Sequence, residues 1–270
     1  MYKALRISAY LLLAFASVVA SGCSENSDGS GSGTDRPGQT GTAGSTARMI
    51  IDGDFLYAIS GNTVQLFDIS APATPVAWNQ VNLLPSSDIQ TLFAYENYLL
   101  VGAADGIQIL DNTDRASPRP VGDFRHAVTR DPVVAQDDVA YATLRRDDTQ
   151  PGTDIVNQLN VIDISNVETP ELVQVQDDIL DAPSGLAVRG DRLFVCDGES
   201  GMKIFDITEK FAPNLTQILN YIDCDDVIAT DDTLHVIGPR DYSQYNTSLT
   251  PRPQLMSTIR REPVIYLVDR

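Results

Sequence analysis

The sequence contains few of the residues that most often carry enzyme chemistry. Its 270 residues include three cysteines, two histidines and one tryptophan. It has no Walker A, H-E-x-x-H, G-x-S-x-G or C-x-x-C pattern. With only His126 and His235 as candidate bases, a catalytic cysteine is also disfavoured. These absences argue against the common nucleotide-, zinc- and serine-dependent activities.

Positive charge is also scarce. The chain has 19 lysines and arginines against 37 aspartates and glutamates, which gives a formal net charge of −18. Such a chain repels nucleic acids and anionic lipids, so neither is an expected partner. The simpler explanation of the acidity is that it keeps an exported domain soluble.

No apolar run is long enough to span a bilayer, and the N-terminal run over residues 7–20 has the length of a signal-peptide core instead. Lys3 and Arg6 precede it, so residues 1–22 are predicted to be an export signal. Residues 20–23, Ala-Ser-Gly-Cys, resemble a bacterial lipobox, which implies lipidation of Cys23. The alternative is an ordinary signal peptide followed by a chance cysteine.

Residues 23–47 are predicted to be a lipidated cysteine and a flexible tether. From Ser24 onward this stretch is nearly all Ser, Gly, Thr, Asp and Asn, and it has no apolar periodicity. Its mean reach is about 25 Å, so the folded domain, residues 48–270, would stay close to the membrane. Ser24 is not the aspartate that resembles an inner-membrane retention signal. We therefore expect the outer membrane, facing either the periplasm or the outside.

A short apolar motif that contains an aspartate occurs five times along this domain. Its first copy is Leu66-Phe67-Asp68-Ile69-Ser70. The spacings between successive motif aspartates are 43, 52, 43 and 63 residues, and a period of this size indicates a repeat architecture. The five aspartates are Asp68, Asp111, Asp163, Asp206 and Asp269.

Each repeat contains four short β-rich runs separated by turn residues. About ten residues before the aspartate lies an apolar run, a polar turn precedes that run, and prolines follow the motif. Four short strands in about 45 residues, without helical periodicity, typify a β-propeller blade. We predict an all-β fold, a β-propeller of about five four-stranded blades. A sixth is possible if the 63-residue spacing hides a degenerate blade.

The motif resembles a known repeat. The pattern L-x-I-x-D-I-S-x-P-x-x-P, seen most fully at residues 66–75 and 159–170, is similar to the LVIVD repeat of bacterial surface and periplasmic propeller proteins. The resemblance covers residues 48–270. It implies the propeller fold and no particular activity, because members of that family mostly lack an assigned one. The motif aspartate is expected to be structural, since its short side chain can accept backbone N–H groups of the next turn.

The fifth blade is the least regular part of this prediction. Residues 266–269, Tyr-Leu-Val-Asp, are predicted to be its third strand, so its outer strand is either supplied by residues 40–46 or absent. Residues 238–261 then form a long insertion between its second and third strands, and residues 145–158 form another in blade three. Long loops in a compact repeat are commonly functional or disordered.

The same fold places two cysteines near each other. Cys196 ends the second strand of blade four, and Cys224 precedes the first strand of blade five. Both positions are expected on the top face of such a propeller, so a disulfide is predicted in an oxidising compartment. The alternative is a pair of small, separate thiols.

Candidate binding residues gather on the same predicted face. Tyr242 and Tyr245, with neighbouring basic residues, belong to the blade-five insertion and suit a binding surface. Several acids precede the innermost strands or follow Cys196, and such oxygens could hold Ca²⁺. No metal-loop spacing supports a specific site, so strand capping and solvated acidity remain the alternative. These acids are Asp88, Asp131, Asp197, Asp225 and Asp226.

These patterns predict a lipid-anchored, monomeric β-propeller of the bacterial cell envelope. We expect it to act as a binding module whose top face contacts a protein or a glycan. The alternative is a periplasmic or surface enzyme with an axial acidic site, in which Asp88, Asp131 and Asp225 act as acid, base or metal ligands. A third possibility is an envelope-assembly scaffold that binds membrane-protein machinery by its exposed loops.

Overall fold

The computed structural model describes residues 44–83, 88–125, 132–146, 156–248 and 252–260, apart from the side chain of Arg146. The chain divides into two compact units, residues 1–36 and 37–270, and every described residue belongs to the second. Cys23, His126, Asp131 and residues 266–269 lie outside the described residues. Within the described ranges, no helix is long and apolar enough to cross a membrane.

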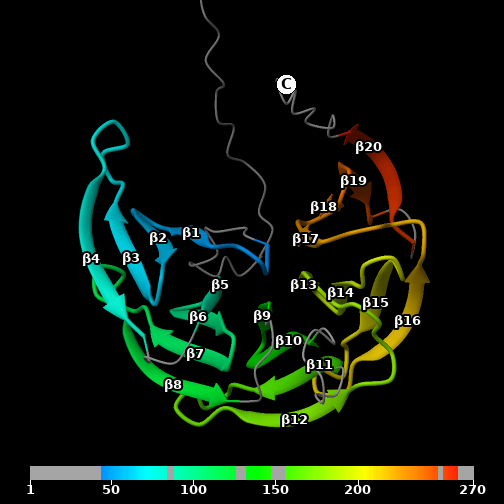
Figure 1. The fold of residues 1–270 in the computed structure, drawn as a ribbon, viewed down its shortest axis with the longest axis horizontal. Coiled ribbons are helices and arrows are strands. Elements are labelled where there is room, and N and C mark those ends of the chain that lie inside the picture. The colour runs from blue at the N-terminus through cyan, green and yellow to red at the C-terminus, as the bar shows by residue number, and fades with distance from the viewer. Residues whose placement is uncertain (1–43, 84–87, 126–131, 147–155, 249–251, 261–270) are drawn as a thin grey trace, which may run out of the picture. The chain divides into compact units, whose positions relative to one another are not determined.

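The described strands form five antiparallel four-stranded sheets, arranged in a ring as the blades of a β-propeller (Figure 1). Blades one and two consist of β1 (Met49–Asp52), β2 (Phe55–Ser60), β3 (Thr63–Asp68), β4 (Val76–Asn82), β5 (Ile89–Tyr95), β6 (Tyr98–Ala103), β7 (Gly106–Asp111) and β8 (Arg119–Arg125). Blades three to five consist of β9 (Val133–Gln136), β10 (Val139–Arg146), β11 (Val156–Asp163), β12 (Glu171–Gln176), β13 (Leu186–Arg189), β14 (Arg192–Cys196), β15 (Met202–Asp206), β16 (Asn214–Leu219), β17 (Asp226–Ala229), β18 (Thr233–Ile237), β19 (Asp241–Asn246) and β20 (Gln254–Arg260). In each blade the first strand is innermost and the fourth is outermost, which confirms the predicted fold.

Every blade repeats the same irregularity between its third and fourth strands. In blade one, the pairing of β3 with β4 shifts by one residue between Leu66 and Phe67. The same shift occurs at the matching position of the other four blades. A β-bulge of this kind increases the local twist of a strand pair, so all five blades share one twisted shape.

The core lies between neighbouring blades. Because side chains alternate along a strand, each blade has one face toward the preceding blade and one toward the next. Four buried apolar clusters fill the interfaces between consecutive blades. Two fully buried tyrosines extend these interfaces to the loops of the next blade: Tyr57 donates to the carbonyl of Arg115 at 2.8 Å, and Tyr141 to that of Lys210 at 2.7 Å. Burial raises the pKa of Tyr57 to about 12.

Blade five corrects the sequence prediction. Its third strand is β19, not residues 266–269, and its fourth is β20, so most of the predicted insertion over residues 238–261 is strand. The sequence of β19, Asp-Tyr-Ser-Gln-Tyr-Asn, is too polar to show the motif. The predicted insertion in blade three is also shorter, because β10 and β11 take its two ends. Residues 147–155 lie outside the described residues.

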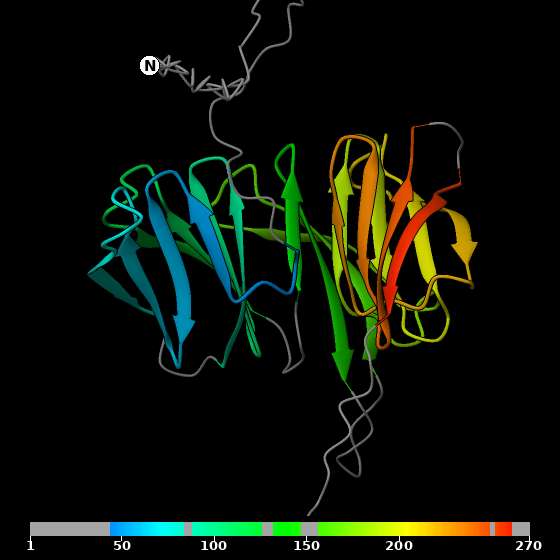
Figure 2. The same cartoon turned by 90° about the horizontal axis from the view of Figure 1, so that it is seen from above.

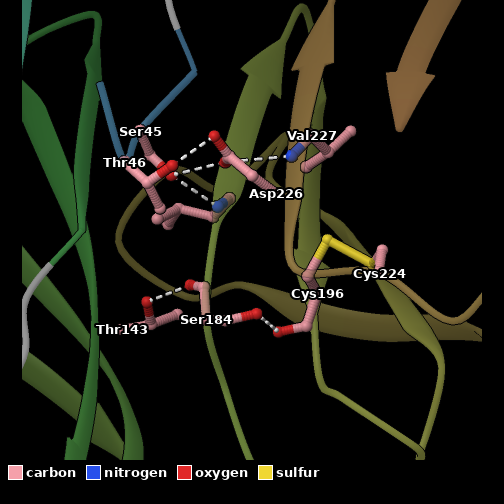
Figure 3. Close-up of a disulfide and its surroundings, with 9 residues drawn as sticks. Ser45, Thr46, Thr143, Ser184, Cys196, Cys224, Asp226 and Val227 are labelled. Carbon is pink, nitrogen blue, oxygen red and sulfur yellow. Dashed lines mark hydrogen bonds between the residues drawn. A yellow bond between two sulfur atoms is a disulfide. The ribbon is translucent and has the colours of Figure 1, made fainter. Parts of the chain in front are cut away.

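A turn at residues 44–47, which we call the junction turn, precedes β1 and contacts blades two, four and five (Figure 3). The hydroxyl of Ser45 accepts the N–H of Leu186 in β13 at 2.7 Å, and the carbonyl of Ala47 accepts the N–H of Leu92 in β5 at 2.8 Å. Neither sequence prediction for ring closure holds, since blade five supplies its own outer strand and this segment is a turn rather than a strand.

Candidate functional site

The strands run between two opposite faces of the ring (Figure 2). The top face holds the turns between second and third strands and the linkers from one blade to the next. The bottom face holds the turns between first and second strands and those between third and fourth strands. The two faces differ in how closely their loops repeat from blade to blade.

The bottom face repeats one hydrogen bond in all five blades. The motif aspartate accepts the N–H of the residue two positions later, as Asp163 does from Ser165 at 2.8 Å. In blade five Asn246 takes this role and accepts from Ser248 at 2.9 Å. The hydroxyl and N–H groups of these partners hold the pKa of the four carboxyls below its usual value, to about 2 for Asp111. The expected structural role is confirmed for Asp68, Asp111, Asp163 and Asp206, whereas Asp269 lies outside the described residues.

The top face varies from blade to blade. Cys196 and Cys224 form the predicted disulfide, with their Cα atoms 5.3 Å apart (Figure 3). Next to it, Gly198 and Cys224 form an isolated antiparallel bridge. These contacts hold the turn at residues 197–201 of blade four against the linker to blade five. Among the described residues, no other pair of blades is joined by a disulfide.

The predicted axial acids do not form a metal cluster in the part of the chain that is described. Asp88 and Asp225 are exposed, and Asp131 lies outside the described residues. Within the described residues, no three or more His, Cys, Asp or Glu side chains are placed to hold a metal ion. Ca²⁺ binding therefore stays a prediction without a described site.

Asp226 is turned toward the junction turn rather than into open solvent. Its carboxylate accepts the hydroxyl of Thr46 at 2.5 Å, that of Ser45 at 3.3 Å and the N–H of Val227 at 2.9 Å (Figure 3). Burial raises the pKa of this carboxyl despite these bonds. The observed contacts of Asp226 are those of a junction residue.

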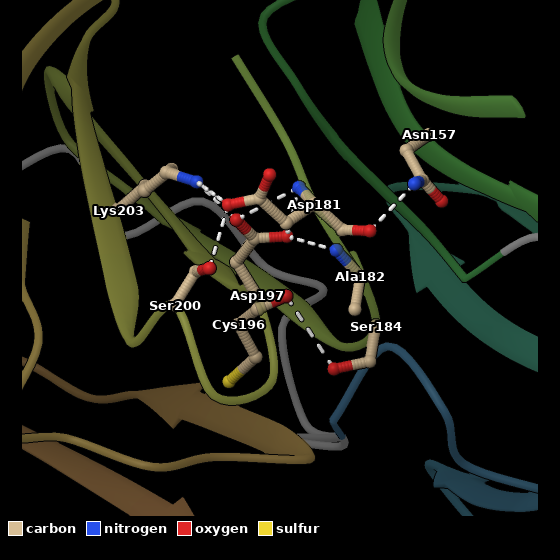
Figure 4. Close-up of polar contacts among 8 residues, drawn as sticks. All are labelled: Asn157, Asp181, Ala182, Ser184, Cys196, Asp197, Ser200 and Lys203. Carbon is tan, nitrogen blue, oxygen red and sulfur yellow. Dashed lines mark hydrogen bonds and ion pairs between the residues drawn. The ribbon is translucent and has the colours of Figure 1, made fainter.

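Asp197 is fully buried and holds a buried lysine (Figure 4). Its carboxylate contacts Nζ of Lys203 and accepts the N–H groups of Asp181 at 2.9 Å and Ala182 at 2.8 Å. The Asp181 carboxylate lies 3.7 Å from the same Nζ and accepts the Ser200 hydroxyl at 2.6 Å. The hydroxyl of Ser200 and then the lysine lower the pKa of Asp181. The charge of Lys203 is thus balanced inside blade four.

A cavity of about 590 Å³ lies between blade five and the linker that enters it. Tyr221 and Asp223 of the linker, with Asp241, Tyr245 and Arg260 of β19 and β20, contribute to its lining. Asp223 and the ends of β19 and β20 that carry Asp241 and Arg260 belong to the top face. Burial, with Asp241 nearby, raises the pKa of the Tyr245 phenol.

The two predicted tyrosines of β19 are separated by the alternation of the strand. Tyr245 lines the cavity, whereas the hydroxyl of Tyr242 lies 2.7 Å from Nδ1 of His235 and accepts from Nε2 of Gln244 at 2.8 Å. Of the two predicted tyrosines, Tyr245 therefore lines this cavity and Tyr242 does not.

A family model described as the LVIVD repeat matches residues 43–82, 153–178 and 183–221. The chain contains LVIVD repeats. The matched ranges hold blade one, β11 and β12 of blade three, and blade four. No curated protein sequence matches the chain.

Solved structures share the propeller fold of these LVIVD repeats at low sequence identity. The computationally designed Ika8 protein is 12% identical with a TM-score of 0.55, over 78% of this chain and 60% of that one. BamB from Moraxella catarrhalis is 16% identical with a TM-score of 0.50, over 78% and 59%. The periplasmic gluconolactonase PpgL of Pseudomonas aeruginosa is 10% identical with a TM-score of 0.59, over 77% and 67%. The chain thus spans about three fifths of the length of the first two.

Two features of the site escaped the sequence prediction. The first is the motif of blade five, which reads Asn246-Thr247-Ser248 where the other blades have Asp-x-Ser or Asp-x-Thr. A motif definition that allowed asparagine in place of aspartate would have located β19. The second is a polar side chain three residues before each motif residue. This position holds Gln65, Gln108, Asn160, Lys203 and Ser243.

Proposed function

We propose that this LVIVD-repeat propeller is a binding module of the bacterial cell envelope and that its top face contacts a partner protein. The observation that supports this most is the contrast between the two faces. The bottom face has the same hydrogen bond five times, whereas the top face carries the disulfide, the buried lysine and the cavity of about 590 Å³. Repeated loops suit a scaffold, and loops that differ suit recognition.

Solved structures with this fold support a binding role as one of its uses. They include a periplasmic gluconolactonase and a chain of the mitotic checkpoint complex, so similar propellers occur in an enzyme and in a protein assembly. Binding is the better supported of the two here. Asp88 and Asp225 are exposed and belong to no described metal cluster, whereas an axial enzyme site needs converging carboxylates.

The proposal includes anchoring through lipidated Cys23 at the outer membrane, with the residues between Cys23 and the turn at residues 44–47 as tether. It rests on the lipobox-like sequence Ala-Ser-Gly-Cys and on the Ser and Gly content that follows. Mass spectrometry of the N-terminal peptide should find a diacylated Cys23 as the first residue. A free thiol at Cys23, or an intact Met1, would rule the anchor out.

Photo-crosslinking tests the binding surface. A photoreactive residue replaces Glu199 in the top turn of blade four, or Asp191 in its bottom turn; both positions are exposed and belong to the same blade. In native envelopes, we expect position 199 to give one discrete crosslinked protein and position 191 to give none. Equal crosslinking from both positions would contradict a top-face partner, and a crosslink to glycan alone would replace the protein by a polysaccharide.

A further inference from the structure

Blades four and five carry different side chains at one equivalent internal position. In blade five a cavity lies at this position. In blade four Lys203 pairs with Val195 of β14, and in blade five Ser243 pairs with Val236 of β18. Each residue directly precedes the two residues between which the register of its blade shifts, so they are structural equivalents. A serine therefore occupies the place of a buried lysine, and the cavity of about 590 Å³ is lined by this serine.

The negative charge around this position is kept although the lysine is lost. In blade four Asp197 directly follows β14, and its equivalent after β18 is Gly238. A Cβ placed on Gly238 would lie 2.6 Å from the carbonyl oxygen of Asp223 and 3.2 Å from Oδ1 of Asp241. The Asp241 carboxylate therefore lies beside the region where the side chain of Asp197 begins in blade four. Asp223, the equivalent of Ala182, adds a second carboxylate to the lining.

No ion pair joins Asp223 or Asp241 to a lysine or arginine among the described residues. Arg260 also lines the cavity, and it is paired with Asp241 across β19 and β20 at the top end of the two strands. Both Arg260 and Asp223 are exposed. The remaining lining includes the hydroxyls of Ser243 and Thr258, 2.9 Å apart, and the ring of Tyr245.

We propose that this cavity binds an alkylammonium group, in the position that the Lys203 ammonium takes in blade four. Asp223 and Asp241 supply the opposite charge, the hydroxyl of Ser243 accepts an N–H, and the aromatic side chains of Tyr221 and Tyr245 suit a cation and its alkyl chain. Arg260 disfavours a second positive charge, so the site takes a monoamine in preference to a polyamine.

This inference deepens the proposed function. Binding of an ammonium group does not depend on that function, but the identity of its natural source does. A lysine side chain of a partner protein supplies it if the top face is a protein-binding surface. A free small amine is the other source of the same chemistry. The strongly acidic chain, with its net charge of −18, attracts either.

Calorimetric titration of the purified full chain with n-butylammonium chloride, in a phosphate buffer of low ionic strength, tests the site. We expect saturable 1:1 binding that weakens as salt is added, and no binding of n-butanol. Asp241→Asn should weaken binding about tenfold or more, because it removes one of two charges that face the ligand. Asp191→Asn is the matched control, since Asp191 lines a separate cavity of about 200 Å³ on the bottom face.

Filling the cavity gives a second, independent test. Ser243→Lys introduces the residue of blade four, and Ser243→Gln introduces that of blades one and two, where Gln65 and Gln108 hold the equivalent position. Both variants should abolish butylammonium binding while the thermal midpoint stays at or above that of the wild type. If only one folds, that one decides the test. Undiminished binding in a folded variant, or equal weakening by Asp191→Asn, would overturn the proposal.

A lysine peptide and its Nε-acetylated form separate the two sources. If the lysine peptide binds and its acetylated form does not, the result supports a lysine side chain of a partner protein. If butylammonium binds and the lysine peptide does not, the result supports a free amine. The crosslinking outcome is independent of both: a partner crosslinked at position 199 with no amine binding would refute this inference and leave the proposed function standing.

Discussion

At the scale of single residues, one acceptor side chain after each third strand sets the bottom face. Asp163 and its equivalents accept the N–H two residues later, and Asn246 does so without a charge. The requirement is therefore an oxygen acceptor at this position, and the negative charge is secondary.

Replacement of Asp163 separates these two contributions. Asp163→Ala should lower the free energy of unfolding by about 1 kcal/mol, because the turn N–H of Ser165 loses its acceptor. Asp163→Asn should cost clearly less, since asparagine serves this turn in blade five. Urea unfolding measures both; equal losses in the two variants would show that the charge is what matters.

The depressed pKa of Asp111 makes stability depend on acid. The hydroxyl and N–H of Thr113, with Arg119, lower this pKa to about 2, below the ordinary value of about 3.9 in an unfolded chain. A carboxyl of this kind stabilises the fold fully above its unfolded pKa and loses that contribution as pH falls toward the folded value. The stability difference between wild type and Asp111→Asn should thus shrink between about pH 5 and pH 2. A difference that is constant over this range would contradict the assignment.

At the scale of elements, β19 and the turn at residues 44–47 show where sequence patterns fail. The strands of blades one to four carry alternating or continuous apolar residues, which predicted their positions well. In β19 the apolar pattern is replaced by Tyr, Ser and Gln. The third strand of blade five was therefore predicted at residues 266–269, where the apolar pattern returns. The role of Ser45 depends on hydrogen bonds to Leu186 and Asp226, residues more than a hundred positions away, and no local pattern reports such contacts.

Removal of the Ser45 hydroxyl tests the junction. Ser45 is fully buried, and Ser45→Ala leaves the N–H of Leu186 without its acceptor, so we expect a loss of about 1–3 kcal/mol in unfolding free energy. Thr46→Ala is the control, because Thr46 is exposed and its hydroxyl bonds the carboxylate of Asp226. If both variants have the same urea unfolding midpoint as the wild type, the turn at residues 44–47 does not stabilise the propeller.

Reduction of the disulfide tests the link between blades four and five. Cys196 and Cys224 are separated by 28 residues, and closing a loop of this length is worth about 3.5 kcal/mol in the chain-entropy model. A reductant should therefore lower the unfolding free energy by about 2–4 kcal/mol. The same change is expected in a Cys23→Ser variant, whereas an unchanged midpoint after verified reduction would show that the crosslink adds nothing.

At the scale of the whole molecule, the sequence predicted the architecture better than the site. Blade number, strand order and the disulfide follow from the repeat and its spacing, because each blade is one local unit that packs on its neighbours. The cavity beside Ser243 was not predictable, since it arises from the difference between equivalent positions in two blades once their register is known. Of the predicted binding residues, Tyr245 lines that cavity, while Asp197 and Asp226 are engaged in internal contacts.

Hydrogen–deuterium exchange tests the top-face claim most directly, because it observes both faces of the same molecule at once. The full chain is compared in native envelopes and after purification. We expect slower exchange in envelopes for peptides that cover residues 197–201 and 238–242 on the top face, and no change for residues 164–170 and 207–213 on the bottom face. Protection confined to the bottom peptides, or spread equally over both faces, would contradict a binding module that works through its top face.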